Sequence, residues 1–323
     1  MRTALITGIS GQDGAYLSRM LLEKGYEVVG LLDPSRSSSL WKLDYLGVRD
    51  RIRFERCDLK SLDEVHTFLK KNDPDEIYNF AAQSSVGASF QQPSDTINFN
   101  VLSVLNILEA LRRSGSGARF YQSSSSEMFG KVDRLPVRED TPMHPLSPYA
   151  VSKAAAHWMT INYRESFGLF ACCGVCFNHE SYLRDERFFV KKVITEALRI
   201  KAGEQKVLKV GNLDVNRDFG YSPKYVEAMW MMLQKEHPSD YLICSGRSIS
   251  LRRIVEHVFD RLKIDMSKVW TDPSLTRPNE MIDIFGDNSK AKRELGWNYD
   301  IDFFDVLDRL LEEEVGVQNG RWP

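Results

Sequence analysis

The chain begins Met1-Arg-Thr-Ala-Leu-Ile-Thr-Gly8-Ile-Ser-Gly11-Gln-Asp-Gly14, and this run is the clearest indication of its architecture. An apolar strand pattern leads into Gly-x-x-Gly-x-x-Gly, and a helical pattern follows at once. In that context the first glycine permits a tight turn, the second lets the backbone approach a pyrophosphate, and the third lets helix and strand pack closely. The helix N-terminus adds N–H donors and positive potential. The residues that we predict to bind a dinucleotide here are Gly8, Gly11, Gln12, Asp13 and Gly14.

Apolar strand-like runs alternate with amphipathic helical runs through the first half of the chain, which predicts a parallel sheet covered on both faces. The predicted strands are Thr3–Thr7, Glu27–Leu32, Arg53–Cys57, Glu76–Phe80, Arg119–Gln122 and Ala171–Phe177. The predicted helices are Ala15–Lys24, Leu62–Lys70, Asn98–Arg112 and Tyr149–Glu165. We therefore expect an α/β fold with a doubly wound parallel sheet of the Rossmann type.

The pattern changes near residue 180. The elements predicted beyond it are the helices Tyr225–Gln234, Leu251–Leu262 and Phe304–Glu314 and the short strands Val207–Val210 and Tyr241–Cys244. Because no low-complexity linker separates the halves, we expect the two lobes to pack together. We predict a dinucleotide-binding Rossmann domain over residues 1–180 and a smaller substrate-binding lobe over residues 181–323, interleaved with the first.

Composition excludes several classes of function. The chain has 323 residues and a formal net charge of -2, so it lacks the global positive field that recruits nucleic acid or anionic lipid. It shows no leader pattern and no apolar stretch long enough to cross a bilayer, so we expect a cytoplasmic protein. Three of its five cysteines cluster at Cys172, Cys173 and Cys176, where we expect buried strand thiols and no metal site.

The end of the second predicted strand bears on cofactor choice. Asp33 would accept hydrogen bonds from an adenosine ribose and repel a 2′-phosphate, which favours NAD, whereas Arg36 would favour NADP. Asp58, after the third strand, could accept from an adenine amino group or simply face solvent in a turn. The remaining residues that we predict to lie against the dinucleotide are Leu59, Ala81 and Ala82.

Tyr149 and Lys153 are four residues apart on a predicted helix, so both side chains project into one site. A nearby ammonium lowers the pKa of a phenol, and the phenolate would then accept a hydroxyl proton as hydride leaves carbon. Ser124, Ser125 and Ser126 end the fifth strand and would hydrogen-bond the substrate oxygen. Glu127 follows them; alcohol oxidation needs no carboxylate here, whereas proton abstraction alpha to a new ketone does.

Cations in the second half could neutralise a nucleoside diphosphate, since arginine grips phosphate in bidentate fashion. They are expected at loop or helix-start positions, and each taken alone is more consistent with a solvated side chain than with a functional one. The candidates are Lys191, Lys192, Arg217 and Arg277, together with Asn178 in Asn178-His-Glu-Ser181.

These motifs together resemble the extended short-chain dehydrogenase/reductase superfamily and, within it, the GDP-mannose 4,6-dehydratase family. The resemblance covers nearly the whole chain and is strongest at Ile6–Gly14, Ala81–Val86, Tyr121–Gly130, Ser147–Lys153, Phe177–Ser181, Asn216–Gly220 and Arg277–Glu280. Gln-Asp between the glycines and Asn-His-Glu-Ser separate this family from the more general epimerases and reductases.

The resemblance implies a redox-neutral reaction on a GDP-hexose: oxidation at C4, loss of water across C5 and C6, and return of the hydride to C6. By motif, Tyr149 is the C4-hydroxyl base, Lys153 its electrostatic partner, and Glu127 the C5 base that assists departure of the C6 hydroxyl. Ser125 stands where the family has threonine. Residues implied to hold the substrate are Ser84, Ser85, Ser126, Asn178, Lys191, Lys192, Arg217, Arg277 and Glu280.

Two departures from the family leave alternatives open. The resemblance implies NADP as the cofactor and tetramer contacts through the loop after the second strand. In that loop Pro34-Ser35 stands where the family has an Arg-Arg pair, and Asp33 before it favours NAD. The choice of cofactor and the tetramer contacts of this loop therefore stay open. Serine at 125 keeps the hydroxyl but loses a methyl, which leaves room for a bulkier sugar such as a GDP-mannoheptose. We expect a GDP-sugar 4,6-dehydratase that forms a homo-oligomer, either a dimer or a tetramer. A GDP-4-keto-sugar reductase or epimerase and a catalytically silent nucleotide-binding protein are the alternatives.

Overall fold

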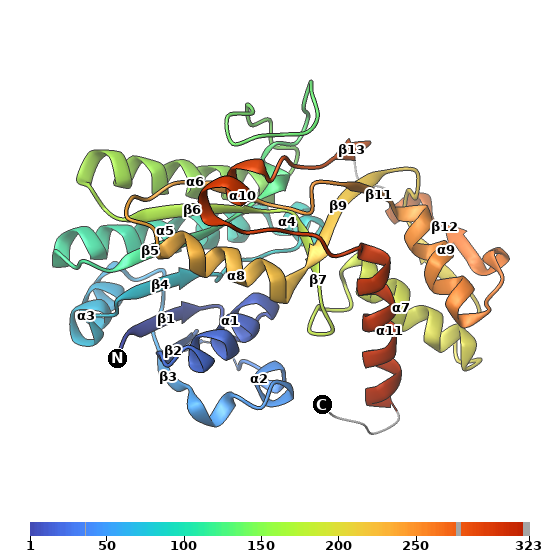
Figure 1. Cartoon of the computed structure of the whole chain (residues 1–323), viewed down its shortest axis with the longest axis horizontal. Helices are drawn as coiled ribbons and strands as arrows, with labels where there is room; N and C mark the ends of the chain where they lie inside the picture. The colour runs from blue at the N-terminus through green and yellow to red at the C-terminus, as the bar shows by residue number, and fades with distance from the viewer. Residues whose placement is uncertain (36, 276–278, 319–323) are drawn as a thin grey trace.

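The computed structural model describes residues 1–35, 37–275 and 279–318, and a seven-stranded parallel sheet forms its centre (Figure 1). The strand order is β10-β6-β5-β4-β1-β2-β3. The strands are β1 Thr3–Thr7, β2 Glu27–Leu32, β3 Arg53–Arg56, β4 Glu76–Asn79, β5 Arg119–Ser125, β6 Ala171–Cys176 and β10 Tyr241–Ile243. The order reverses beside β1, which confirms the predicted doubly wound sheet of the Rossmann type.

Both faces of the sheet are buried except at the edge strand β3, so most of its strands read as nearly continuous apolar runs. Ala4 and Ile6 of β1 belong to one core, with helices α1 Gln12–Glu23 and α8 Ser222–Leu233. Leu5, between them in the sequence, belongs to the opposite core. The helices of that second face are α3 Leu62–Asn72, α5 Pro93–Ser114 and α6 Pro148–Phe167.

The predicted strands of the first half are all present; β1 and β2 have the predicted ends, and β6 ends one residue earlier than predicted. β5 continues three residues beyond the predicted Gln122, because Ser123 and Ser125 pair with Gly174 and Cys176 of β6. β3 and β4 each end one residue earlier than predicted. The three clustered cysteines lie in β6 as buried free thiols, as predicted.

Helices α1, α5 and α6 begin earlier than the periodicity predicted, whereas α3 begins at Leu62 as predicted. Ser147 accepts a hydrogen bond from the N–H of Ala150, and Pro148 occupies the first position of α6. Ser61 caps α3 in the same way. Two short helices were not predicted, α2 Trp41–Tyr45 and α4 Val86–Gln91, because each has too few residues to show a helical period.

The second half crosses between the lobes. β10 pairs in parallel with β6, and α8 packs against α1, so residues after 180 complete the large sheet and one of its faces. The elements of the smaller lobe are β7 Asn178–Glu180, α7 Phe189–Lys201, β8 Leu208–Val210, β9 Asn216–Tyr221, β11 Ser248–Ser250, α9 Leu251–Leu262, β12 Val269–Thr271, β13 Asp283–Ile284 and α11 Phe303–Gln318, with α10 Ser289–Leu295 beside β10. Short 3₁₀ turns lie at Arg49–Arg51, Ser126–Met128, Met266–Lys268 and Pro273–Leu275.

Helix α7 was also absent from the predicted elements, although its signal is present. Val190, Val193, Ile194 and Ala197 are buried at the i, i+3, i+4, i+7 spacing of an amphipathic helix. Lys191 and Lys192 therefore lie in the first turn of a helix.

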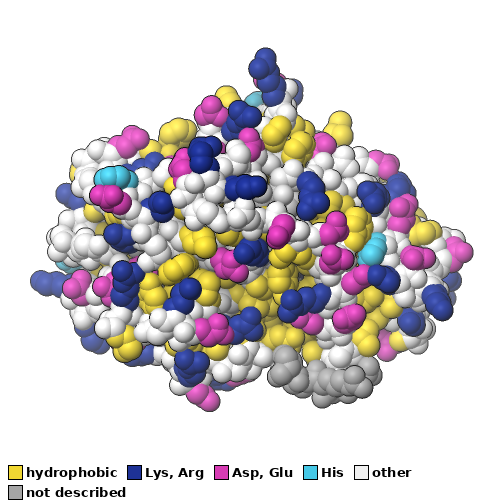
Figure 2. Space-filling view, viewed as in Figure 1, with side chains coloured by type: hydrophobic (Ala, Val, Ile, Leu, Met, Phe, Trp, Pro, Cys, Tyr) yellow, Lys and Arg dark blue, Asp and Glu magenta, His cyan; other side chains and the backbone are white. Residues whose placement is uncertain are grey.

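Acidic and basic side chains are mixed over the face seen in Figure 2, in keeping with the net charge of -2. Among the described residues, no helix is both long and apolar enough to span a membrane.

Candidate active site

A cavity of roughly 1040 Å³ opens at the carboxyl ends of the large sheet, between the two lobes. Its walls include the ends of β1, β2, β4, β5 and β6, where ligands bind in folds of this kind. The opposite wall comes from the smaller lobe, through β7, the segment after it, and β9. The volume is at the upper end of the range for a single small ligand, which suits two ligands side by side.

The glycine loop forms one end of this cavity. Gly8 has a φ of +66°, and a Cβ there would lie 2.8 Å from the amide nitrogen of Ala81. A Cβ on Gly14 would lie 2.6 Å from a backbone carbonyl oxygen, so helix and strand touch as predicted. Gly11 is the N-cap of α1, and a Cβ there would meet one atom, 3.1 Å away. The loop thus leaves backbone room for a phosphate at the N-terminus of α1.

The side of the cavity expected to hold the adenosine is built from the neighbouring strand ends. Asp33 lines it, and one carboxylate oxygen accepts from the Ser35 amide at 2.8 Å and the Ser35 hydroxyl at 2.6 Å. The other predicted residues on this side are Asp58, Leu59, Ala81 and Ala82, and all of them line the cavity. Arg36 lies outside the described residues. This set of glycines, small residues and an acidic group fits a nicotinamide dinucleotide.

Tyr149 and Lys153 lie on one face of α6 and are both buried in the cavity wall. The Lys153 Nζ donates to the carbonyl oxygen of Ser123 at 2.7 Å and lies 6.0 Å from the centroid of the Tyr149 ring. The Ser125 hydroxyl lies near enough to the Tyr149 phenol to lower its pKa. The structure therefore brings the predicted hydroxyl, phenol and ammonium together.

The expected lowering of the Tyr149 pKa is not found. Burial raises the pKa of Tyr149 to about 12, and the Ser125 hydroxyl only partly opposes burial and the nearby Glu127 carboxylate. Burial also lowers the pKa of Lys153, to about 8. The prediction failed because ionising a buried group costs free energy, and the spacing of residues along a helix does not show how deeply they are buried.

Glu127 follows β5 in the 3₁₀ turn Ser126–Met128 and lines the same cavity. Its N–H donates to the Ser125 hydroxyl at 3.3 Å, which fixes the turn. Its carboxylate is close enough to raise the pKa of Tyr149 through charge. A carboxylate and a phenol thus face one space.

Most of the predicted substrate residues also line the cavity, at Ser84, Ser85, Ser126, Asn178, Lys192, Arg217 and Glu280. Asn178 and Arg217 lie in β7 and β9, not in loops as predicted. Lys192 donates to the carbonyl of Lys209 at 2.7 Å. One Glu280 oxygen is buried without a hydrogen-bond partner among the described residues, which leaves it an acceptor for a ligand hydroxyl.

Lys191 is a correction to the predicted set. Its ammonium binds the Glu314 carboxylate and the carbonyl oxygen of Tyr182, and it does not line the cavity. Successive helical residues point about 100° apart, so only one of two adjacent lysines can face the site. Arg277 lies outside the described residues.

Several cavity residues were not anticipated. Arg184, Arg187 and Phe188 come from the segment after β7, and Lys42 comes from α2. The sequence signal was weak, because α2 has only five residues and the segment lies between predicted elements. The described residues contain no group of three His, Cys, Asp or Glu side chains that could hold a metal ion.

Known proteins resemble this chain over nearly its whole length. Residues 5–310 match the family described as GDP-mannose 4,6 dehydratase. GDP-mannose 4,6 dehydratase 1 of Arabidopsis thaliana is 41% identical over 325 residues, covering 97% of this chain and 90% of that protein. GDP-mannose 4,6-dehydratase of Yersinia enterocolitica is 39% identical, covering 92% of this chain and 89% of that protein.

Solved structures share the whole fold. DesIV, a dTDP-glucose 4,6-dehydratase from Streptomyces venezuelae with NAD and TYD bound, has a TM-score of 0.87 at 24% identity and covers 99% of this chain and 98% of its own. RMD from Pseudomonas aeruginosa, complexed with NADPH, has a TM-score of 0.81 at 26% identity and covers 97% of this chain and 98% of its own.

Proposed function

The chain belongs to the GDP-mannose 4,6-dehydratase family, and from that premise we propose that it converts GDP-mannose to the GDP-4-keto-6-deoxy sugar. It is a hydro-lyase that uses NAD(P). The observation that carries the proposal is the presence of Glu127 in one cavity with Ser125, Tyr149 and Lys153. A GDP-4-keto-sugar reductase or epimerase is not favoured, because neither needs that carboxylate.

The cofactor would be held by the glycine loop and by Asp33, Asp58, Leu59, Ala81 and Ala82. When bound, the nicotinamide supplies a hydride acceptor for C4 that later returns the hydride to C6. Asp33 supports a preference for NAD, since its carboxylate would repel a 2′-phosphate in this cavity.

Tyr149 would take the proton of the C4 hydroxyl as the C–H electron pair leaves C4. Ser125, which lines the same cavity, would orient the same oxygen. The Lys153 ammonium would stabilise the phenolate by charge. The product of this half-reaction is a 4-keto sugar, whose C5 proton is acidic because the carbanion is conjugated with the ketone.

Glu127 would then remove the C5 proton and pass it to the departing C6 hydroxyl, which leaves as water. A double bond forms between C5 and C6 as the C6–O bond breaks. Return of hydride to C6 and of a proton to C5 completes a redox-neutral cycle. General acid and base transfers of this kind contribute about 10²- to 10⁴-fold each.

The rest of the substrate would be held by the smaller lobe. Lys192 and Arg217 would neutralise the diphosphate, and Asn178 would hydrogen-bond it. Glu280, whose buried oxygen has no hydrogen-bond partner in the described part of the chain, would accept from a hydroxyl of the ligand. GDP-mannose is the first substrate to test, with GDP-mannoheptose second because Ser125 leaves more room than threonine.

The test separates the two half-reactions. Glu127→Gln should still oxidise C4 when mixed with GDP-mannose, so reduced nicotinamide should accumulate while 4-keto-6-deoxy product falls by at least about 10²-fold. Tyr149→Phe should give neither. Absorbance of the reduced nicotinamide and mass spectrometry of the sugar nucleotide measure the two steps.

Exchange of the C5 hydrogen in D₂O provides an independent readout, since it requires the Glu127 base and not net turnover. Wild-type protein should incorporate deuterium at C5, and Glu127→Gln should not. A Glu127→Gln variant with wild-type product formation would overturn the proposal, as would net consumption of added reduced cofactor by the wild-type protein.

We further propose a cytoplasmic homo-oligomer. Trp158 and Val151 of α6 are 58% and 44% exposed, and Leu102 of the neighbouring α5 is 41% exposed. Apolar side chains grouped on two adjacent helices support an interface between copies of the chain. Light scattering should show a dimer or tetramer that Trp158→Glu converts to smaller species; a monomeric wild-type protein would contradict this.

A further inference from the structure

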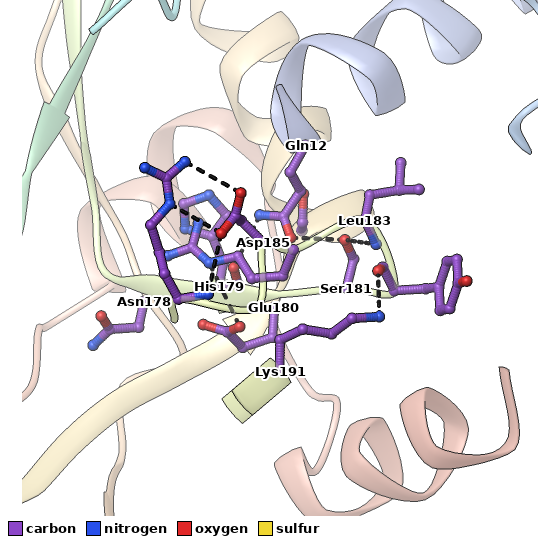
Figure 3. Close-up of polar contacts among 12 residues, drawn as sticks. Gln12, Asn178, His179, Glu180, Ser181, Leu183, Asp185 and Lys191 are labelled. Atoms are coloured by element: carbon purple, nitrogen blue, oxygen red, sulfur yellow. Dashed lines mark hydrogen bonds and ion pairs between the residues drawn. The ribbon is translucent and has the colours of Figure 1, made fainter. Parts of the chain in front are cut away.

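Two sequence motifs that are 166 residues apart form one buried polar cluster. The His179 Nε2 lies 3.0 and 2.9 Å from the two carboxylate oxygens of Asp13. Gln12 donates to the carbonyl of His179 at 3.0 Å and accepts from the Ser181 hydroxyl at 2.7 Å (Figure 3). The Gln-Asp of the glycine loop therefore binds the β7 segment directly.

The hydrogen bonds of His179 determine its protonation. Its Nδ1 lies 2.6 Å from the carbonyl oxygen of Phe177, which can only accept. Its Nε2 faces the Asp13 carboxylate, which also only accepts when ionised. Both ring nitrogens must then donate, so the ring is an imidazolium. The Tyr225 ring stacks on it with centroids 4.9 Å apart, a favourable position for a cation.

The charges around the pair agree with this assignment. The Asp13 carboxylate raises the pKa of His179 against the opposing effect of burial, while Arg184 opposes protonation by charge. Glu180 is the other buried acid beside the ring; burial raises its pKa, while the charges of Arg184 and His179 lower it. Ser222, at the start of α8, donates to Asp13 at 2.9 Å. The groups that face the pair thus come from α1, β7, the segment after β7, and α8.

The position of Asp13 presents an electrostatic problem for the proposed function. It is the second residue of α1, where the helix N-terminus should meet a pyrophosphate, and a bare carboxylate there would repel that anion. A charge-balanced pair removes the repulsion while leaving the backbone N–H groups free to donate.

We propose that His179 is a positioning residue that, as an imidazolium, neutralises Asp13 and fixes the glycine loop against the substrate lobe so that the loop binds a dinucleotide pyrophosphate. The inference rests on the proposed function, because it requires a dinucleotide at the glycine loop. It also gives Gln12 and Asp13, which both line the cavity, a role in supporting that loop.

The experiment combines NMR with binding. In ¹⁵N-histidine-labelled protein, the ring signals of His179 are assigned as those that are absent from His179→Gln. At pH 8 their ¹⁵N chemical shifts should be those of an imidazolium in the wild type and those of a neutral imidazole in Asp13→Asn. Calorimetry with NAD and NADP should show affinity about tenfold or more weaker in His179→Gln, which leaves an unneutralised carboxylate near the phosphates. The double variant Asp13→Asn/His179→Gln should recover to within about threefold of wild type, because no charge remains.

His257→Gln is the matched control, since His257 pairs with Asp308 at 2.7 Å between α9 and α11, outside the cavity. It should leave dinucleotide affinity unchanged. Neutral shifts for His179 in the wild type at pH 7, or a double variant no better than His179→Gln, would overturn the proposal. The wild-type NMR result decides the protonation even if a variant fails to fold. A dehydratase assay on the wild-type protein tests the proposed function by itself, so a failure of the His179 proposal can be distinguished from a failure of that function.

Discussion

The protonation of Lys153 should set the pH dependence of C4 oxidation. With a Tyr149 pKa of about 12, forming the phenolate at pH 7 costs about 7 kcal/mol, from five pKa units at 1.36 kcal/mol each. The Lys153 ammonium lies 6.0 Å from the ring centroid. At an effective dielectric constant of about 20, a unit charge at that distance offsets about 3 kcal/mol, or roughly a hundredfold in rate.

The ammonium is available only below its own pKa of about 8. Below pH 8 each pH unit raises the phenolate fraction tenfold, whereas above it Lys153 loses charge as fast as Tyr149 gains it. We therefore expect single-turnover C4 oxidation to rise about fiftyfold between pH 6 and pH 8 and then level off. Stopped-flow absorbance of the reduced nicotinamide, after mixing with GDP-mannose, measures it.

Lys153→Met should slow this step about a hundredfold at pH 7 and abolish the break near pH 8. Lys70→Met, on the exposed side of α3, is the matched control and should behave as wild type. A rate independent of pH between 6 and 8 in the wild type, or a Lys153→Met rate within threefold of wild type, would refute the reasoning. The wild-type profile alone decides the case if the buried substitution impairs folding.

Three further perturbations test the rest of the site. Asp33→Ala should shift the ratio of NADP to NAD affinity by about tenfold or more toward NADP, because a carboxylate no longer repels the 2′-phosphate; an unchanged ratio in calorimetry would contradict it. Gly14→Ala would place a Cβ 2.6 Å from a backbone oxygen and should lower the free energy of unfolding in urea by about 1–3 kcal/mol. Gly117→Ala, with nothing within 4 Å of its Cβ, should not, and equal effects would show that the close contact does not matter. The pKa of His179 is raised from 6.5 and that of Asp13 is lowered from 3.8. The contribution of this ion pair to the free energy of unfolding should therefore be fully present between pH 3.8 and pH 6.5. It should fall as pH rises through the folded His179 pKa, and also as pH drops through the folded Asp13 pKa. Unfolding in urea should thus be easier at pH 9 than at pH 6, and this difference should shrink in His179→Gln.

Features that depend on local chain geometry were predictable. The glycine loop, the alternation of strands and helices, and the shared face of Tyr149 and Lys153 all follow from backbone preferences and helical period. Glu127 was identified from the run of serines before it and from the family resemblance, although β5 ends three residues later than predicted. Helix α7 carried the same kind of signal and was overlooked.

The sequence by itself determined the sheet, its binding edge and the family, because glycine conformations and apolar periods act over a few residues. Only the tertiary structure decided which of Lys191 and Lys192 faces the cavity, and that β10 completes the large sheet. It also decided the pKa of Tyr149 and the pairing of Asp13 with His179. The physical reason is that desolvation and ion pairing depend on distances between segments far apart in the chain, which no local pattern encodes.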